Sequence, residues 1–277
     1  DIRLKPEMLQ SFRRGVLSMK ILSESKVEGM VPYQFAAEIP ACTVMNFIEG
    51  PNLQQHVETG QMKDWSDILD VGYQLATIIV RAHGLPQRVL HRDIRPPNIM
   101  LSDYYSTAEI KVAVLDFDLS WHMGASEASI SHENSANPYL APEQIDVRRD
   151  VSTRSAAVDS FGIGMTLYYM RTARDPLPGQ YRHSSWNEDV SRTMCAHPCR
   201  QWQSLPLRYA RLILKCTREI QSERHDVTQI RSELTRLRDA IRNSSCVRSS
   251  EMIAEEVLAR AAQIGRASCR ERVFRTV

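Results

Sequence analysis

The sequence predicts an α+β fold in two unequal parts, a small portion of strands and helices followed by a larger, mostly helical portion. Three observations support this expectation. Runs of β-branched and apolar residues typical of short strands occur only before residue 118. From Ser155 onward, apolar residues recur at the three- and four-residue spacing of helices. No internal repeat appears along the chain.

The elements of the first half follow from local pattern. Residues 6–22 carry apolar side chains three and four positions apart, which predicts an amphipathic helix with a basic opposite face. Residues 42–53 are rich in apolar and β-branched residues and predict a strand, with a helix after it through His56. Residues 64–83 start at an acidic capping residue and stop before a glycine, which predicts a longer helix.

The second half begins with strands and continues with helices. Residues 98–101 and 110–117 predict two short strands, and residues 120–137, rich in Ser, Gly, Ala and Asn, predict a loop. Apolar periodicity then predicts three helices, at residues 155–170, 206–219 and 226–242.

The bulk composition excludes some classes of partner. The chain has 277 residues with 35 Lys and Arg against 33 Asp and Glu, a formal charge of +2. This balance argues against nucleic acid or an anionic membrane as the main partner. The longest apolar stretches, residues 71–80 and 161–170, have about half the length that a bilayer span needs, so we expect no membrane segment.

The six cysteines include no Cys-x-x-Cys pair, which argues against a zinc ribbon or a disulfide framework. We therefore expect reduced thiols and a cytoplasmic location. The one local cluster, Cys195, His197 and Cys199, does not have the spacing of common zinc sites, so we expect no metal there.

The segment HRDIRPPNIM, residues 91–100, supplies a carboxylate and an amide just before a predicted strand. Phosphoryl transfer needs such a pair: Asp93 orients the attacking hydroxyl and accepts its proton, and Asn98 provides an oxygen ligand for Mg²⁺. Taken alone, the same residues are compatible with a hydrogen-bonded polar turn.

The predicted strand KVAVLDF ends in a second carboxylate, Asp116. A carboxylate at a strand end that faces the first pair is where a further Mg²⁺ contact belongs. The structural alternative is an Asx turn that closes a hairpin. The two motifs together, in this order, favour a nucleotide site.

These motifs resemble those of the protein kinases, most closely the serine/threonine branch. His91-Arg92-Asp93 matches the catalytic-loop motif, Asp116-Phe117-Asp118 the magnesium-binding motif with its last glycine replaced, and Ala141-Pro142-Glu143 the motif that closes the activation segment. Asp159 in VDSFGIG and Arg224 in SERHDV fit two further family positions, so the resemblance spans residues 6–242.

The resemblance implies roles for several buried residues. Glu143 and Arg224 would form a largely buried ion pair, and Asp159 would hold the catalytic loop from below. Met19, Phe117 and His91 would stack in a spine of side chains, although packing alone equally explains Met19.

The resemblance also implies an ATP site. Met45 takes the gatekeeper position, Asn46, Phe47 and Ile48 form the hinge whose backbone pairs with adenine, and Met100 lies beneath the ring. Apolar walls with a few fixed polar groups suit such a pocket, and the alternative for both methionines is simple core packing.

Arg95 occupies the position at which serine/threonine kinases have lysine. We expect it to neutralise the transferred phosphate, although its planar guanidinium differs from an ammonium group. This residue favours serine or threonine in a protein as the acceptor.

Other positions depart from the family pattern. The 11 glycines form no GxGxxG loop, and Lys5 lies too close to the first helix to be the nucleotide lysine. Gly15 stands where the family has the glutamate that pairs with that lysine. Asp118 replaces a glycine and Ala136 replaces a threonine. We therefore expect a kinase domain that lacks its amino-terminal part.

These expectations divide the chain into four segments. Residues 1–45 would be part of the small kinase lobe, and residues 46–242 the hinge and large lobe. Residues 243–263 would form a helical tail. Residues 264–277 resemble the translation of a sequencing adapter, so we expect them to be an artefact; their alternative is a basic helical tail.

The predicted function is ATP- and Mg²⁺-dependent phosphorylation of Ser or Thr in a protein substrate. Two alternatives remain. Gly15 favours a pseudokinase that scaffolds partners. The HxDxxxxN pattern also occurs in small-molecule phosphotransferases of the aminoglycoside or choline kinase type, against which the Ala141-Pro142-Glu143 motif argues.

Overall fold

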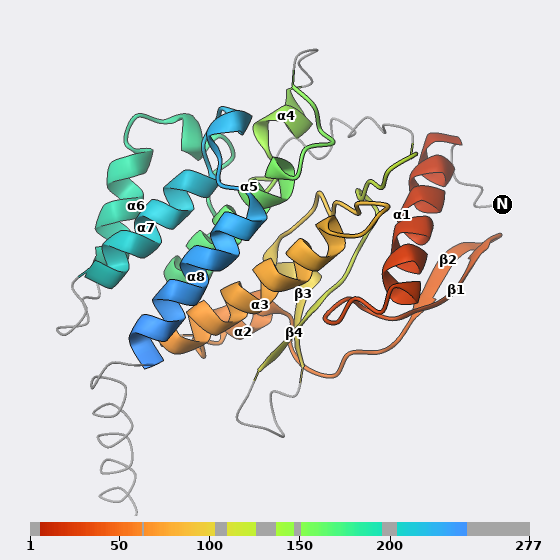
Figure 1. The fold of residues 1–277 in the computed structure, drawn as a ribbon, viewed down its shortest axis with the longest axis horizontal. Helices are drawn as coiled ribbons and strands as arrows, with labels where there is room; N and C mark the ends of the chain where they lie inside the picture. The colour runs from red at the N-terminus through yellow and green to blue at the C-terminus, as the bar shows by residue number, and fades with distance from the viewer. Residues whose placement is uncertain are drawn as a thin grey trace, which may run out of the picture. The chain divides into compact units, whose positions relative to one another are not determined.

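A computed structural model describes residues 6–62, 64–102, 110–125, 137–146, 151–195 and 204–242 (Figure 1). The chain divides into two compact units, Asp1–Thr235 and Arg236–Val277. In the first unit the strands are β1 (Tyr33–Glu38), β2 (Ala41–Met45), β3 (Ile99–Ser102) and β4 (Lys111–Val114). The helices are α1 (Pro6–Glu24), α2 (Leu53–Glu58), α3 (Trp65–His83), α4 (Pro142–Ile145), α5 (Ala157–Thr172), α6 (Trp186–Cys195), α7 (Ser204–Cys216) and α8 (Val227–Arg242). Three short 3₁₀ helices are η1 (Pro96–Asn98), η3 (Gln180–Arg182) and η4 (Gln221–Glu223).

The smaller part of the first unit consists of α1 and the β1–β2 sheet. The two strands pair antiparallel, from Glu38 with Ala41 to Tyr33 with Met45. Helix α1 lies beside this sheet (Figure 1) and buries Met19, as its apolar stripe predicts.

The larger part is built around α5, which packs on α3, α6 and α7. Every residue of α5 from Val158 to Met170 is buried, because its apolar residues are not confined to one stripe. Tyr209 on α7 donates its buried hydroxyl to the Leu167 carbonyl of α5 at 2.9 Å. Helix α3 also packs on β4, so it connects the helical layer to the β3–β4 hairpin (Figure 1).

The predicted α+β class is confirmed, and most predicted elements form within a few residues of their expected ends. The predicted strand at 42–53 is wrong beyond Met45. The chain leaves β2 there, and Asn52 starts α2 with a capping box: its Oδ1 accepts the Gln55 N–H at 2.8 Å, while Gln55 Oε1 accepts the Asn52 N–H at 3.0 Å. Neither β1 nor α6 was expected from the sequence.

The described part of the second unit is the end of α8, which stops at Arg242. The predicted tail at 243–263 and the predicted artefact at 264–277 lie outside the described residues. Among the described helices, none has the combination of length and apolarity that crossing a membrane requires.

Candidate active site

The β3–β4 hairpin brings together the two predicted Mg²⁺ ligands. Ile99 pairs with Val114, so Asn98 and Asp116 lie just beyond the same end of the hairpin. The Leu115 N–H donates to the Asn98 carbonyl at 2.9 Å, which extends the pairing one residue past the strands. Residues far apart in sequence therefore meet through strand register.

Asp93 lies beside this hairpin end and is 7% exposed. Asn98 Nδ2 donates to Asp93 Oδ2 at 3.1 Å and to the Asp93 carbonyl at 3.0 Å. Asn137 Nδ2 donates to Oδ1 at 3.2 Å, and Arg95 Nε lies 3.2 Å from Oδ2. These contacts hold the carboxylate in one orientation.

Asp159 of α5 fixes the backbone that carries Asp93. Its carboxylate accepts the N–H groups of His91 at 2.9 Å and Arg92 at 2.7 Å, and it contacts His83 Nε2 at 2.7 Å. Complete burial opposes ionisation, but the hydrogen bond from His83 and the neighbouring positive groups leave the pKa of Asp159 below its usual value. Arg92 has a φ of 68°, an uncommon conformation that this carboxylate stabilises.

The segment after β4 is held in a similar way. Asp116 has a φ of 62°, and its Oδ1 accepts the Asp118 N–H at 3.2 Å. The Phe117 ring lies 4.8 Å from that of His91, as expected for a shared spine. Met19 is buried, which both the spine and simple packing explain.

Three carboxylates interact electrostatically at this site. Partial burial, followed by the charges of Asp116 and Asp93, raises the pKa of Asp118, and Arg14 partly offsets the shift. Asp118 therefore lies close enough to both Asp93 and Asp116 to experience the charge of each. A cation among these carboxylates would relieve the repulsion.

The two methionines predicted to enclose adenine lie in different sheets. Met45 ends β2 and is half-buried. Met100 lies in β3, where it pairs with Ala113 and forms a bridge to Asn52. Their adenine roles stay predictions.

The predicted hinge residues differ in their surroundings. The Asn46 N–H donates to the Pro32 carbonyl at 3.0 Å, so that donor is already used within the protein. Phe47 is 90% exposed. Ile48 lines a cavity of about 380 Å³ together with residues of α3 and β4. The role of this segment in binding adenine likewise stays a prediction.

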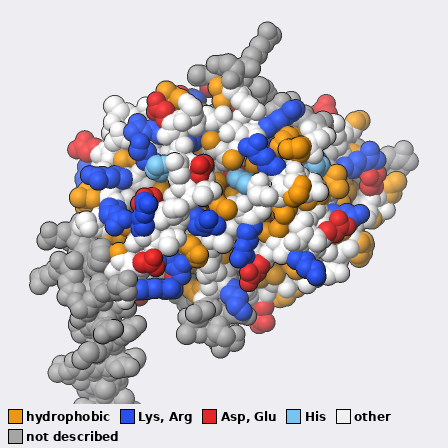
Figure 2. Space-filling model, viewed as in Figure 1, with side chains coloured by type: hydrophobic (Ala, Val, Ile, Leu, Met, Phe, Trp, Pro, Cys, Tyr) orange, Lys and Arg blue, Asp and Glu red, His pale blue; other side chains and the backbone are white. Residues whose placement is uncertain are grey.

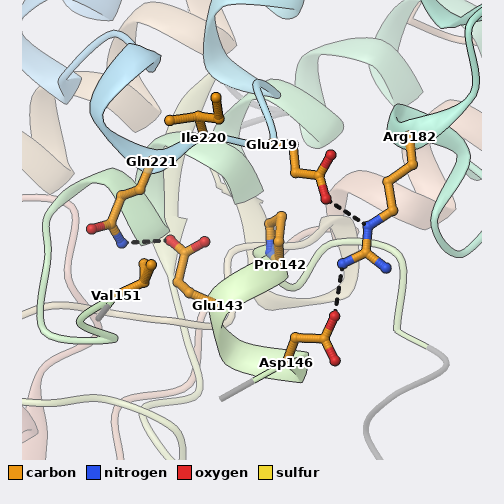
Figure 3. Close-up of a pocket in the computed structure, with 8 residues that line it drawn as sticks. All are labelled: Pro142, Glu143, Asp146, Val151, Arg182, Glu219, Ile220 and Gln221. Atoms are coloured by element: carbon orange, nitrogen blue, oxygen red, sulfur yellow. Dashed lines mark hydrogen bonds and ion pairs between the residues drawn. The ribbon is translucent and has the colours of Figure 1, made fainter. Parts of the chain in front are cut away.

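Glu143 and Arg224 form the expected buried pair. The contact is bidentate, with Nη1 to Oε1 at 2.6 Å and Nη2 to Oε2 at 2.8 Å. Gln221 Nε2 also donates to Glu143 Oε1 at 2.7 Å (Figure 3). This arrangement fixes α4 to the segment before α8.

A cavity of about 400 Å³ opens next to this pair (Figure 3). Arg182 lies between Asp146 and Glu219, at 3.0 and 3.2 Å, and Ile220 is exposed on its rim. Asp93 is not among its lining residues, so we do not assign phosphoryl transfer to this cavity.

A further cavity of about 430 Å³ is not lined by Asp93 itself, but unlike the first cavity it is lined by two residues that contact Asp93. Arg95 and Asn137, which both contact Asp93, line one end of it. The remaining lining residues are Gln54, Pro96, Pro97, Pro138, Tyr139, Asp175, Pro176, Leu177 and Pro178.

Asn137 is a site residue that sequence reasoning missed. The sequence pattern singled out Ala136, because it replaces a threonine of the family, but Ala136 lies outside the described residues. The available signal was the place of Asn137 just before Pro138 in the segment closed by Ala141-Pro142-Glu143. The structure shows that this amide, one position later than expected, reaches Asp93.

Comparison with known proteins agrees with this geometry. Residues 12–234 match the family described as protein kinase domain. The chain belongs to the protein kinase family. Asp93, Asn98 and Asp116 all lie within the matched range, and their catalytic and metal-binding roles stay predictions.

Several curated relatives are serine/threonine-protein kinases. The chain is 25% identical to the kinase PrkC of Bacillus subtilis and 26% identical to serine/threonine-protein kinase A of Synechocystis, over 80% and 77% of its length. It is 23% identical, over 80% of its length, to a probable serine/threonine-protein kinase, pats1, of Dictyostelium discoideum. The matched regions span 33%, 42% and 7% of these relatives, respectively.

Proposed function

We propose that the chain transfers the terminal phosphate of ATP to a Ser or Thr hydroxyl of a protein substrate, with Mg²⁺ as cofactor. The observation that carries the proposal is the meeting of Asp93, Asn98 and Asp116 at one end of the β3–β4 hairpin. The names of the serine/threonine kinase relatives support the choice of acceptor.

Each residue has a distinct chemical role. Asp93 accepts the proton of the acceptor hydroxyl while that oxygen bonds to the terminal phosphorus, and the bond from phosphorus to the bridging oxygen breaks to leave ADP. Arg95, half-exposed beside Asp93, stabilises the charge on the transferred phosphate.

The donor set fits a magnesium ion. Asn98 donates through Nδ2 to Asp93, which leaves its Oδ1 free to act as a ligand. The Asp116 carboxylate supplies a second hard oxygen ligand, as Mg²⁺ prefers. When bound, the ion would neutralise negative charge on the phosphate oxygens.

The cavity beside Asp93 favours a protein chain over a small alcohol as the phosphate acceptor. This cavity is lined by four separate segments of the chain, and five of its eleven lining residues are prolines. Asp175 accepts the Tyr139 hydroxyl at 2.5 Å, and Arg95 is paired with Asp93. Neither charge is therefore directed at a small polar substrate.

We also propose a reducing location such as the cytoplasm. Cys42, Cys195 and Cys216 are free thiols among the described residues.

Phosphate transfer to protein, detected by mass spectrometry with ATP and Mg²⁺, tests the proposal. Asp93→Asn should lose at least about 100-fold in kcat, because it removes the proton acceptor. Asp146→Asn is the matched control, since Asp146 lies on the cavity below α4 and pairs with Arg182. Equal activity of wild type and Asp93→Asn would refute the assignment.

Gly15 favours a second candidate, a pseudokinase that binds nucleotide without transferring phosphate. Such a protein would show a Mg²⁺-dependent thermal shift with ATP but no phosphorylated product, in wild type and in Asp93→Asn alike. Phosphate found on a small alcohol and on no protein would instead indicate a small-molecule phosphotransferase.

A further inference from the structure

Helix α1 meets the segment after β4 through a continuous row of polar contacts. Ser11, Arg14, Gly15 and Ser18 are spaced by three, one and three residues and therefore share one face of the helix. All four contact the segment 117–122, which directly follows the predicted Mg²⁺ ligand Asp116.

Arg14 makes the central contacts of this row. It is 5% exposed, its Nε donates to the Ser120 carbonyl at 2.7 Å, and its Nη2 donates to Ser11 Oγ at 2.8 Å and to the Asp118 carbonyl at 3.4 Å. Ser11 Oγ itself donates to the Asp118 carbonyl at 3.1 Å. One buried guanidinium thus binds two carbonyls of the segment, those of Asp118 and Ser120, through separate nitrogens.

Ser18 extends the row toward the end of the helix. Its Oγ lies 3.1 Å from His122 Nδ1, and both residues are buried. The segment is therefore held to α1 at both ends, by Ser11 with Arg14 and by Ser18.

Gly15 permits this close approach. A Cβ at this position would lie 2.8 Å from the Phe117 carbonyl oxygen and 3.3 Å from its carbon. The oxygen has little freedom to move, because it also accepts the Ser120 N–H at 3.0 Å. Any side chain at residue 15 would therefore force apart α1 and the backbone next to Asp116.

The contacts reach the predicted metal ligand Asp116 through one residue, Asp118. The Asp118 carbonyl is held by Ser11 and Arg14, and the Asp118 N–H donates to Asp116 Oδ1 at 3.2 Å. Moving the helix face would therefore turn the Asp116 carboxylate.

We propose that Arg14 and Gly15 are positioning residues for Asp116, and that they set the placement of α1 where the family uses a lysine–glutamate pair. Gly15 is then a requirement of this arrangement and not merely the loss of a carboxylate. The claim that Arg14 and Gly15 position a Mg²⁺ ligand rests on the proposed function, whereas the contacts between α1 and residues 117–122 do not depend on it.

The first test is the thermal unfolding of the ligand-free protein. Gly→Ala inside a helix ordinarily raises stability. Gly15→Ala should instead lower Tm by about 3 °C or more, because the added methyl group meets backbone. Leu17→Ala, at a 45% exposed position of the same helix, is the control and should shift Tm less. A higher Tm for Gly15→Ala would overturn the proposal.

The second test uses hydrogen exchange and Mg²⁺-dependent ADP binding. Arg14→Lys should speed exchange at residues 118–120 and raise the Mg²⁺ concentration needed for ADP binding at least about threefold, while leaving metal-free ADP affinity unchanged. Arg13→Lys is the matched control, because neighbouring Arg13 pairs with exposed Glu38. A uniform loss of ADP affinity with and without metal would indicate a merely structural residue.

A third variant separates the proposal from the family pattern. Gly15→Glu should weaken Mg²⁺-dependent ADP binding, and stronger binding would overturn the proposal. If the wild type binds no ADP at all, the proposed function fails, and the unfolding and exchange measurements then decide the placement of α1 alone.

Discussion

At the scale of single residues, the ion pair between Glu143 and Arg224 shows how a buried charge depends on its partner. Arg224 also donates to the main-chain carbonyls of Arg218 and Glu219, at 2.6 and 3.0 Å. Both side chains of the pair are almost inaccessible to solvent, so water cannot replace a lost partner.

Arg224→Ala should therefore reduce the free energy of unfolding by about 3–5 kcal/mol, because Glu143 remains buried without its cation. Urea unfolding measures this change. Arg13→Ala, which breaks the solvent-exposed pair with Glu38, should leave the urea midpoint close to that of the wild type. Similar losses in both variants would contradict the distinction.

Asp118 is expected to destabilise the folded protein near neutral pH. Its pKa is raised by partial burial and by Asp116 and Asp93, so folding favours its protonated form. When a group has a higher pKa in the folded than in the unfolded state, it stabilises the fold at pH values below its unfolded-state pKa. This contribution is lost as pH rises through its folded-state pKa. The side chain keeps contact with solvent, which screens part of the effect.

Asp118→Asn should accordingly raise Tm at pH 7, and the gain should disappear toward pH 4, where wild-type Asp118 becomes protonated. Thermal unfolding between pH 4 and pH 8 measures the difference. Glu49→Gln, an exposed position in the loop after β2, controls for the change in net charge. A gain that stays constant across this range would rule out titration of Asp118 as its cause.

At the scale of elements, local pattern was sufficient where one apolar face decides the structure. Helices α1, α3, α7 and α8 were predicted because their apolar residues follow helical periodicity, whereas α5 is a long apolar segment that is buried on all sides. Strand β1, with the sequence YQFAAE, has mixed burial and no clean alternation, so only its pairing with β2 makes it a strand. Helix α6 was missed although its three buried side chains, Trp186, Val190 and Met194, recur every four residues, because the segment is polar on average and short.

The same distinction applies to the candidate site: local motifs predict some of its residues, and packing between distant segments places the others. Asp93, Asn98 and Asp116 were found from motif spacing, because one hairpin and one loop place them. Asn137 and the α1 contact row were not found, because they depend on packing between segments 44 to 107 residues apart. No local spacing encodes such contacts.

At the scale of the whole kinase domain, the cavity beside Asp93 offers an apolar surface for the protein substrate that we propose. Leu177 is 68% exposed on its wall, and five prolines supply ring surface without N–H donors. Contact with an apolar side chain next to the acceptor residue is therefore favoured over hydrogen-bonded recognition.

Peptide substrates with a large apolar residue next to Ser or Thr should have a kcat/KM at least about fivefold above that of peptides with Lys there. Leu177→Lys should abolish this preference without unfolding the protein, since the position is exposed. Ile220→Lys is the matched control, being 57% exposed on the other cavity. A preference that survives in Leu177→Lys, or is lost equally in Ile220→Lys, would place peptide selection elsewhere.

The carboxylate of Asp159 has a consequence for how the two sides of the cleft can move. The Asp159 carboxylate lies on α5, whose residues 158–170 are all buried, and it binds the end of α3 and two consecutive amides of the catalytic loop. The loop that carries Asp93 is therefore held in place by this buried helix. A stationary proton acceptor leaves adjustment to the opposite side, where α1 is held by hydrogen bonds as well as by the buried side chains of Met19 and Leu22. Regulation of this protein is therefore expected to act by displacing α1 over an unmoving catalytic loop.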